Sequence, residues 1–231
     1  MNPKVYGTEH ILYLVISTVI AVAALLLSKK FAKTEKAKTT VLKVLALLLL
    51  CAITANRLSQ VFRYEDVRWD RIIPDSFCGM TSLVLSLAVL FGKRDNIVFH
   101  FVWHLAIFGG MATCFYPAFV GQASSIFYLP TISGLIHHSF SATLGIALLI
   151  HSRIDITYKK WYYTLGGFAC YITVGAFLMQ TFGYSDAYHI AEPIISGTNL
   201  TAWVMAPMYA AGYALVLIVA EQIKKHNKKQ S

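Results

Sequence analysis

A cysteine and a histidine in separate apolar runs are the residues of this sequence best suited to covalent chemistry. Cys78 lies in the run 72–91 and His138 in the run 129–151. If both runs are helices entering a membrane from the same side, Cys78 lies roughly 9 Å in and His138 roughly 14 Å in, at 1.5 Å per residue. Thiol–imidazole catalysis requires such comparable depths. The alternative is structural, because a free cysteine packs as a small hydrophobe and a lone intramembrane histidine can fix helix packing.

Other polar residues within the apolar runs are candidates for substrate binding, because a polar side chain in hydrocarbon is costly unless it faces the bundle interior. Ser82 shares a helical stripe with Cys78, and Ser141 shares one with His138, since residues three or four apart lie on one face. His137 points about 100° away from His138, so a structural role is expected for it. The remaining candidates are Asn56, Arg57, Arg63, Trp103 and His104.

Two of these candidates are arginines at the outer end of the run 42–63. Arg57 and Arg63 could extend to the headgroups as simple interfacial anchors. They could also bind the phosphate of a lipid headgroup, because guanidinium binds phosphate through two parallel hydrogen bonds. The two interpretations are compatible.

A metal site is the less favoured interpretation of the histidines. His100 and His104 are spaced i, i+4, which suits a metal ion, and His137 or His138 could supply a third ligand. However, His100 lies near the opposite membrane surface from His138, and the last runs contain no His-x-x-x-His pair. We expect no metal and no cofactor. The cysteines form no C-x-x-C pair, so neither a disulfide framework nor a zinc knuckle is expected.

The composition requires membrane helices to position these residues. Of 231 residues, 57% are hydrophobic and 13% are charged, which excludes a large soluble catalytic domain. We predict an all-α, polytopic membrane helix bundle forming a single domain over residues 1–231. It has seven transmembrane helices, or six if the interrupted fourth run does not cross. The predicted spans are 8–28, 42–63, 72–91, 97–117, 129–151, 161–183 and 201–223.

Basic residues predict the orientation. Every second connection is rich in lysine or arginine, and such connections face the cytoplasm. The N-terminus is therefore expected outside and the C-terminus inside. The net charge of +9 needs no nucleic acid to explain it, since the lipid bilayer is the expected partner. A plasma (cytoplasmic) membrane is expected, and no oligomeric state is indicated.

The order of several short motifs resembles a known family. These motifs resemble the YwaF-type integral membrane proteins, which are similar to transmembrane protein 164, a cysteine-dependent phospholipid acyltransferase, and more distantly to the androgen-induced membrane hydrolases. The resemblance covers roughly residues 40–220. It is carried by Pro74 to Cys78, Trp103, Tyr116-Pro117, His138, Tyr188 to Pro193, and Trp203.

The resemblance implies acyl chemistry on a phospholipid, lysophospholipid or other fatty-acyl ester. His138 would take the proton of Cys78, and the thiolate would form a thioester with the acyl group. Ser82, Ser141 or Asn56 could then stabilise the oxyanion. The chain departs from the family pattern at Ser76, where the family has histidine, and at two further motifs, where Tyr116-Pro117-Ala118 replaces Thr-Pro-Asp and Glu192-Pro193 replaces Lys-Pro.

Two other classes of function fit the same polar residues. A small-solute transporter or substrate-binding membrane subunit could use a cavity lined by Asn56, Asp75, His100 and His104. It would transport solute even with Cys78→Ser. In a structural membrane protein the histidine and cysteine would only pack, and changing His138 would alter stability alone.

Overall fold

Seven α-helices lie within the described residues, and each overlaps one of the predicted spans. The computed structural model describes residues 6–63, 66–117 and 125–230, with side chains described up to residue 222. Regular secondary structure within these ranges is entirely helical, which confirms the predicted all-α class. The helices are α1 (Thr8–Phe31), α2 (Glu35–Val61), α3 (Phe77–Phe91), α4 (Ile97–Phe115), α5 (Leu129–Ile150), α6 (Tyr162–Phe182) and α7 (Ala202–Gln230), with short 3-10 turns η1 (Trp69–Ile72) and η3 (Tyr158–Lys160).

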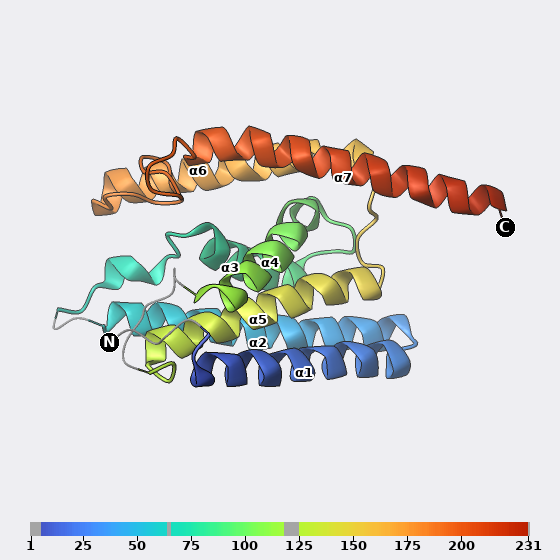
Figure 1. The fold of residues 1–231 in the computed structure, drawn as a ribbon, viewed down its shortest axis with the longest axis horizontal. Coiled ribbons are helices and arrows are strands. Elements are labelled where there is room, and N and C mark those ends of the chain that lie inside the picture. The colour runs from blue at the N-terminus through green and yellow to red at the C-terminus, as the bar shows by residue number, and fades with distance from the viewer. Residues whose placement is uncertain (1–5, 64–65, 118–124, 231) are drawn as a thin grey trace.

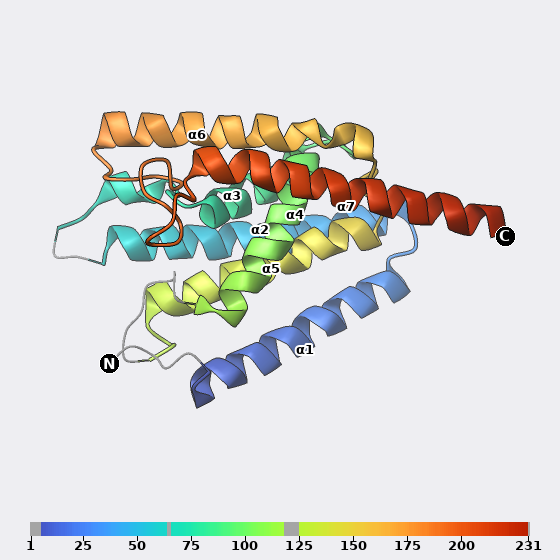
Figure 2. The same ribbon diagram turned by 45° about the horizontal axis from the view of Figure 1, so that its top comes forward.

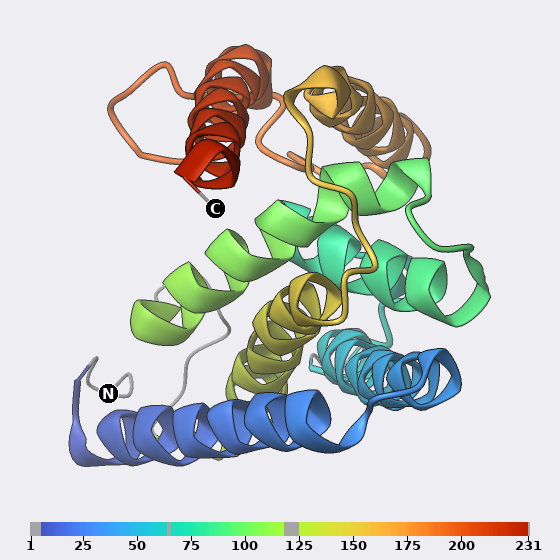
Figure 3. The same cartoon turned by 90° about the vertical axis from the view of Figure 1, so that its right-hand side faces the viewer.

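The helices are arranged in layers around a central group of four. Helices α2, α3, α4 and α5 pack on one another, α1 lies against α5, and α6 and α7 cover the α4 side (Figure 1). Helix α4 crosses the bundle obliquely (Figure 2). In the end-on view α1 and α4 are steeply inclined to the other helices (Figure 3). The start of α1 and the end of α7 lie at opposite ends of the bundle, as an odd number of crossings requires.

Six helices are long and apolar enough to cross a membrane, and α3 is shorter. At 15 residues α3 is about 22 Å long, against a hydrocarbon core of about 30 Å. It begins at Phe77, five residues later than predicted. The apolar run before it contains Pro74, and a proline disfavours the helical conformation in the residue that precedes it. Residues 73–75, between the 3-10 turn η1 and the N-cap Ser76, are non-helical.

Hydrogen bonds from distant residues satisfy the backbone of this non-helical segment. Tyr188 donates its backbone N–H to the Asp75 carbonyl at 2.9 Å and its hydroxyl to the Pro74 carbonyl at 2.5 Å. Arg57 donates to the Arg71 carbonyl at 3.1 Å. Irregular backbone near a membrane is tolerated only where protein supplies such partners. The connection between α6 and α7 therefore docks on the start of α3, with Tyr188 only 1% exposed.

The basic connections gather at the other end of the bundle, where the turns after α1, α3 and α5 lie (Figure 1). Asp95 links two of these turns, because its carboxylate accepts hydrogen bonds from Lys160, from the backbone N–H of Asp155 and from His100. Burial alone would raise the pKa of the Asp95 carboxyl, but these hydrogen bonds hold the pKa below its ordinary value. The carboxylate therefore stabilises the folded state.

We expect Asp95→Asn to lower the thermal midpoint at pH 7 by about 3 to 6 °C, the effect of losing hydrogen bonds to a charged group. Because the pKa is lowered on folding, this stabilisation is present above the unfolded pKa of about 3.9 and disappears as pH falls through the folded pKa. Thermal unfolding in detergent from pH 7 to pH 3 measures it. A difference between variant and wild type that stays constant down to pH 3 would contradict this account.

Close contact between α4 and α5 depends on glycine. A Cβ on Gly110 would lie 2.6 Å from the His138 carbonyl oxygen and 3.0 Å from Cβ of Ala142. A Cβ on Gly145 would lie 2.7 Å from the Ile107 side chain. The small-residue stripe of α5 thus faces α4, and small residues let membrane helices approach closely.

We expect Gly110→Ala to destabilise the bundle by about 1 to 3 kcal/mol, because the added methyl meets backbone of α5, which cannot shift independently. Gly166→Ala is the matched control, since a Cβ there meets nothing within 4 Å and alanine favours helix by about 1 kcal/mol. Thermal unfolding of both variants in the same detergent compares them. Equal midpoints would show that the α4–α5 contact is not tight.

Candidate functional site

Cys78 lies in the first turn of α3. Ser76 is the N-cap, and its hydroxyl accepts the Gly79 backbone N–H at 3.2 Å. The residue that departs from the family pattern thus has a structural role here. Cys78 is half-buried and follows the cap by two residues. The positive end of the helix dipole favours a negative group at this position, which opposes the cost of forming a thiolate in apolar surroundings.

The thiol of Cys78 faces α4. Its Sγ would lie 2.9 Å from a Cβ on Gly109, so glycine is needed for this approach. The Thr113 side chain, one turn further along α4, lies close enough to interact with the thiol and is 7% exposed. The thiol therefore lies beside the Thr113 hydroxyl and against the backbone of Gly109, where no side chain intervenes.

His138 reaches the same level of α4 from the other side. Its carbonyl packs against Gly110, the direct neighbour of the Gly109 that contacts Cys78. The His138 residue is 5% exposed, and its Nδ1 has no hydrogen-bond partner among the described residues. A buried polar atom without a partner is costly, so it commonly signals a functional group.

His137 provides a second link between α5 and α3. Its Nδ1 forms a 3.2 Å hydrogen bond with the Ser82 hydroxyl, and Ser82 lies one turn after Cys78. The rings of His137 and His138 are 4.1 Å apart between centroids. Two separate contacts thus bring the first turns of α3 to the histidine pair of α5. The predicted structural role for one histidine agrees with the Ser82 contact.

Positive charge lies at the outer end of this region. Asp75 pairs with Arg57 at 3.2 Å and with Arg71 at 3.2 Å, so two guanidinium groups share one carboxylate. Arg57 is close enough to influence His137 electrostatically, and Arg71 lies over the Tyr184 ring at 4.5 Å. Arg71 also pairs with Asp70, which pairs with Arg68, so the connected cluster of three arginines and two aspartates has one more positive than negative charge, which suits an anionic group such as phosphate.

Several predicted substrate-binding residues are occupied in other helix contacts. Asn56 donates to the Ser133 hydroxyl at 3.1 Å and the Pro130 carbonyl at 3.3 Å, which joins α2 to α5. Trp103 donates to the Tyr213 hydroxyl at 3.2 Å. His104 is fully buried and bonds the Tyr209 hydroxyl at 2.8 Å. The last two contacts hold α7 on α4.

The remaining predicted residues lie at different places. Ser141 is buried on α5, one turn after His137. Arg63 follows the end of α2, beyond Arg57. His100 bonds Asp95 at 2.7 Å, far along α4 from the Cys78 level, so the expected shared cavity of the histidines and Asp75 is not assembled by these contacts. Within the described residues no group of three or more His, Cys, Asp or Glu could hold a metal ion.

Sequence reasoning missed Thr113 and Gly109, which contact the thiol. The Gly109-Gly110 pair in an apolar run was an available signal, because such pairs mark close helix approach. Thr113 carried no signal in spacing. Two further residues carried a signal without a specific role: Arg71, which shares Asp75 with Arg57, belongs to the arginines after the second apolar run, and Tyr188, which holds the segment before α3, belongs to the family resemblance.

Comparison with known proteins agrees with this architecture. No curated protein and no solved structure matches the chain. A family model matches residues 5–221, nearly the whole chain, and its description is TMEM164 family. With six long apolar helices, the protein is an integral membrane protein. By this match, the chain belongs to the TMEM164 family.

Proposed function

We propose that the protein is an intramembrane acyl-transfer enzyme that acts on phospholipid or other fatty-acyl esters through a thioester on Cys78, with His138 as general base. The observation that carries the proposal is the unpartnered Nδ1 of His138, a buried residue whose backbone carbonyl meets Gly110, the neighbour of the Gly109 that the Cys78 thiol approaches. A general base needs a nitrogen that is not already committed to a neighbour. Membership of the TMEM164 family is in keeping with lipid chemistry.

The first half-reaction would transfer the acyl group to sulfur. His138 takes the Cys78 proton, the thiolate attacks the ester carbonyl, and a tetrahedral oxyanion forms. Thr113 lies beside the thiol, and its hydroxyl could donate to that oxyanion, with Ser82 and Ser141 as further candidates. When the ester C–O bond breaks, the imidazolium returns its proton to the leaving oxygen and a lysolipid departs.

The second half-reaction would release the acyl group. His138 takes the proton of an acceptor hydroxyl, either on a lysolipid or on water, and the oxygen attacks the thioester carbonyl. The C–S bond breaks, an ester or free acid forms, and the thiolate regains the proton from the imidazolium. Atoms and charges balance without a metal or cofactor. The two acceptors distinguish transfer from hydrolysis.

Recognition of the headgroup would use the positive charge near the outer end of α2. Arg57 and Arg71 can bind a lipid phosphate with their remaining N–H groups while they hold Asp75. Arg63 would extend this surface. We place this end of the bundle at the outer leaflet of a plasma (cytoplasmic) membrane, because the basic connections lie at the other end.

Intact-protein mass spectrometry tests the proposal. The purified wild-type protein is incubated with a phospholipid of defined acyl chain and then denatured. We expect an added mass of one acyl group, which neutral hydroxylamine removes because thioesters react with it. Absence of an acyl adduct on folded protein at every time point would contradict covalent catalysis.

A further inference from the structure

Hydrogen bonds near its two ends attach helix α1 to the rest of the bundle. Near its start, Nε2 of His10 donates to the Cys114 carbonyl at 2.8 Å. Near its end, Ser28 bonds His151 at 3.2 Å. Most of α1 between these points is exposed, and it is steeply inclined to α5 (Figure 3). These two hydrogen bonds hold α1 in place, and the part of α1 between them makes little apolar contact with the bundle.

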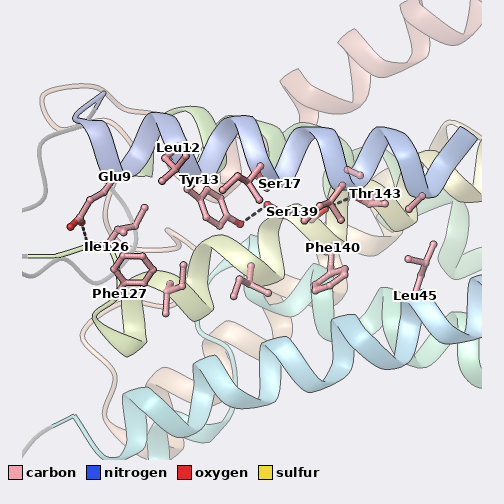
Figure 4. A pocket seen from close by; sticks show the side chains of 16 residues that line it. Glu9, Leu12, Tyr13, Ser17, Leu45, Ile126, Phe127, Ser139, Phe140 and Thr143 are labelled. Atoms are coloured by element: carbon pink, nitrogen blue, oxygen red, sulfur yellow. Dashed lines mark hydrogen bonds between the residues drawn. The ribbon is translucent and has the colours of Figure 1, made fainter.

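A groove of about 380 Å³ lies between these two hydrogen bonds, bounded by α1, α5 and Leu45 of α2 (Figure 4). It forms because α1 presents small side chains to α5, at Ser17, Ala21 and Ala24. On the other side its wall is apolar, with Ile136 and Phe140 of α5. The volume falls within the range of ordinary ligand pockets, about 300 to 1,000 Å³.

The polar groups along this wall satisfy one another. The Tyr13 hydroxyl bonds the Ser139 hydroxyl at 2.7 Å, as Figure 4 shows, and Ser139 also contacts Cys114 Sγ at 3.3 Å. Thr143 donates to the Ser139 carbonyl at 2.7 Å. A ligand in the groove therefore needs no polar group to pair with the polar side chains of this wall. An apolar groove that faces the hydrocarbon of a bilayer has no water to fill it, so a hydrocarbon chain is the matching occupant.

The length of the groove suits an acyl chain. Its lining on α1 extends from Leu12 to Ala24, which is about 18 Å along a helix. That is slightly more than half of a hydrocarbon core of about 30 Å, so it is the depth of one leaflet. The groove is therefore long enough for one chain of a phospholipid and too short to cross both leaflets.

Charge at the mouth indicates which headgroup belongs to that chain. Glu9 is exposed and supplies the charge of the lining, at the end of the groove that faces the membrane surface. Its carboxylate accepts the Ile126 backbone N–H at 2.8 Å and the Ser125 hydroxyl at 3.1 Å, which fix its position (Figure 4). A negative group held there attracts an amine headgroup and repels an anionic one.

We propose that the groove binds one acyl chain of a phospholipid with an amine headgroup, in the leaflet at the N-terminal end of α1. The site is distinct from the region of Cys78, since on α5 the His137 side chain bonds Ser82 of α3, whereas the Ser139 side chain bonds Tyr13 of α1. The proposal depends on the membrane location and not on acyl transfer. The bound lipid completes the packing of α1 on α5.

Native mass spectrometry of the Cys78→Ala protein tests the site independently of thioester formation. The protein is incubated with equal amounts of phosphatidylethanolamine and phosphatidylglycerol of the same chains. We expect one retained molecule, with about a fivefold preference for phosphatidylethanolamine from the single carboxylate. Glu9→Gln should bring the two lipids to equal retention, because the glutamine oxygen still accepts the Ile126 N–H without charge. An unchanged preference in Glu9→Gln would overturn the headgroup assignment.

Two tryptophan variants of α1 locate the chain. Ala21→Trp fills the groove and should reduce retention at least about tenfold. Ala23→Trp is the matched control, because Ala23 is exposed and outside the lining, and it should retain lipid like the parent. Equal retention by both variants, or no retained lipid in the parent, would overturn the site. A phosphatidylethanolamine with a diazirine at the chain end should label peptides of α1 or α5.

Discussion

Replacing Cys78 by alanine is expected to abolish the acyl adduct and to lower the acyl-transfer rate by at least about 1,000-fold. Removal of a nucleophile eliminates the covalent route, so only slow uncatalysed transfer remains. Initial rates with a phospholipid donor and a lysophospholipid acceptor in detergent measure the effect. The thermal midpoint should change little, because alanine retains the helix and removes only one sulfur atom from a half-buried position.

Two other cysteines provide matched controls. Cys114 is buried and its Sγ contacts the Ser139 hydroxyl, whereas Cys170 is exposed on α6. Cys114→Ala and Cys170→Ala should each keep the adduct and a rate within about twofold of wild type, since the Cys114 thiol is engaged with Ser139 and the Cys170 thiol is exposed on another helix. Full acyl transfer by Cys78→Ala would contradict a thioester on Cys78. If Cys114→Ala instead lost the adduct and the activity, Cys114 would be the nucleophile.

Replacing His138 by alanine is expected to lower the rate of acyl-adduct formation by about 100- to 10,000-fold, the usual contribution of a general base. The base removes the thiol proton in the first half-reaction and the proton of the acceptor hydroxyl in the second, so adduct formation and adduct loss should both slow. Rapid-quench mass spectrometry of the adduct measures the two steps separately. Added imidazole should restore part of the rate, because it can enter the space that the side chain leaves.

His137→Ala separates this role from packing. Its Nδ1 is already bonded to Ser82, so its loss should lower the thermal midpoint and reduce the rate less than His138→Ala does. Imidazole should have no effect on this variant. If His137→Ala were slower than His138→Ala and imidazole restored its rate, the general base would be His137. If neither variant changed the rate in folded protein, histidine would have no catalytic role.

The apolar runs predicted the existence of every helix, because the length of a hydrocarbon core limits each crossing. The helix α4 begins at Ile97 as predicted, after the N-cap Asn96. Other ends differ: α2 begins at Glu35, before its predicted span 42–63, and α7 continues to Gln230, beyond its predicted span 201–223, because polar residues can continue a helix outside the hydrocarbon. The helix α3 begins late, since its run was counted from residue 72. The apolar character of Ile72 and Ile73 carried no information on backbone conformation, and the proline that follows them decided it.

The candidate site was predictable in part. Helical rise alone placed Cys78 and His138 at comparable depths, and the structure places both beside the Gly109-Gly110 pair. The substrate-binding set was less predictable, because a polar residue inside a membrane run can serve a ligand or a neighbouring helix equally well. In the structure, Asn56 and His104 form hydrogen bonds with side chains of other helices.

The sequence alone determined the all-helical membrane class, the number of apolar runs and the alternation of basic connections along the chain, because these depend on local composition and on the thickness of the bilayer. Only the tertiary structure decided which helices meet. The contact of Cys78 with Thr113, the pairing of His137 with Ser82 and the groove beside α1 all join segments distant in the chain. They depend on crossing angles and on glycine contacts, which the rotation and tilt of whole helices set and which no local pattern encodes.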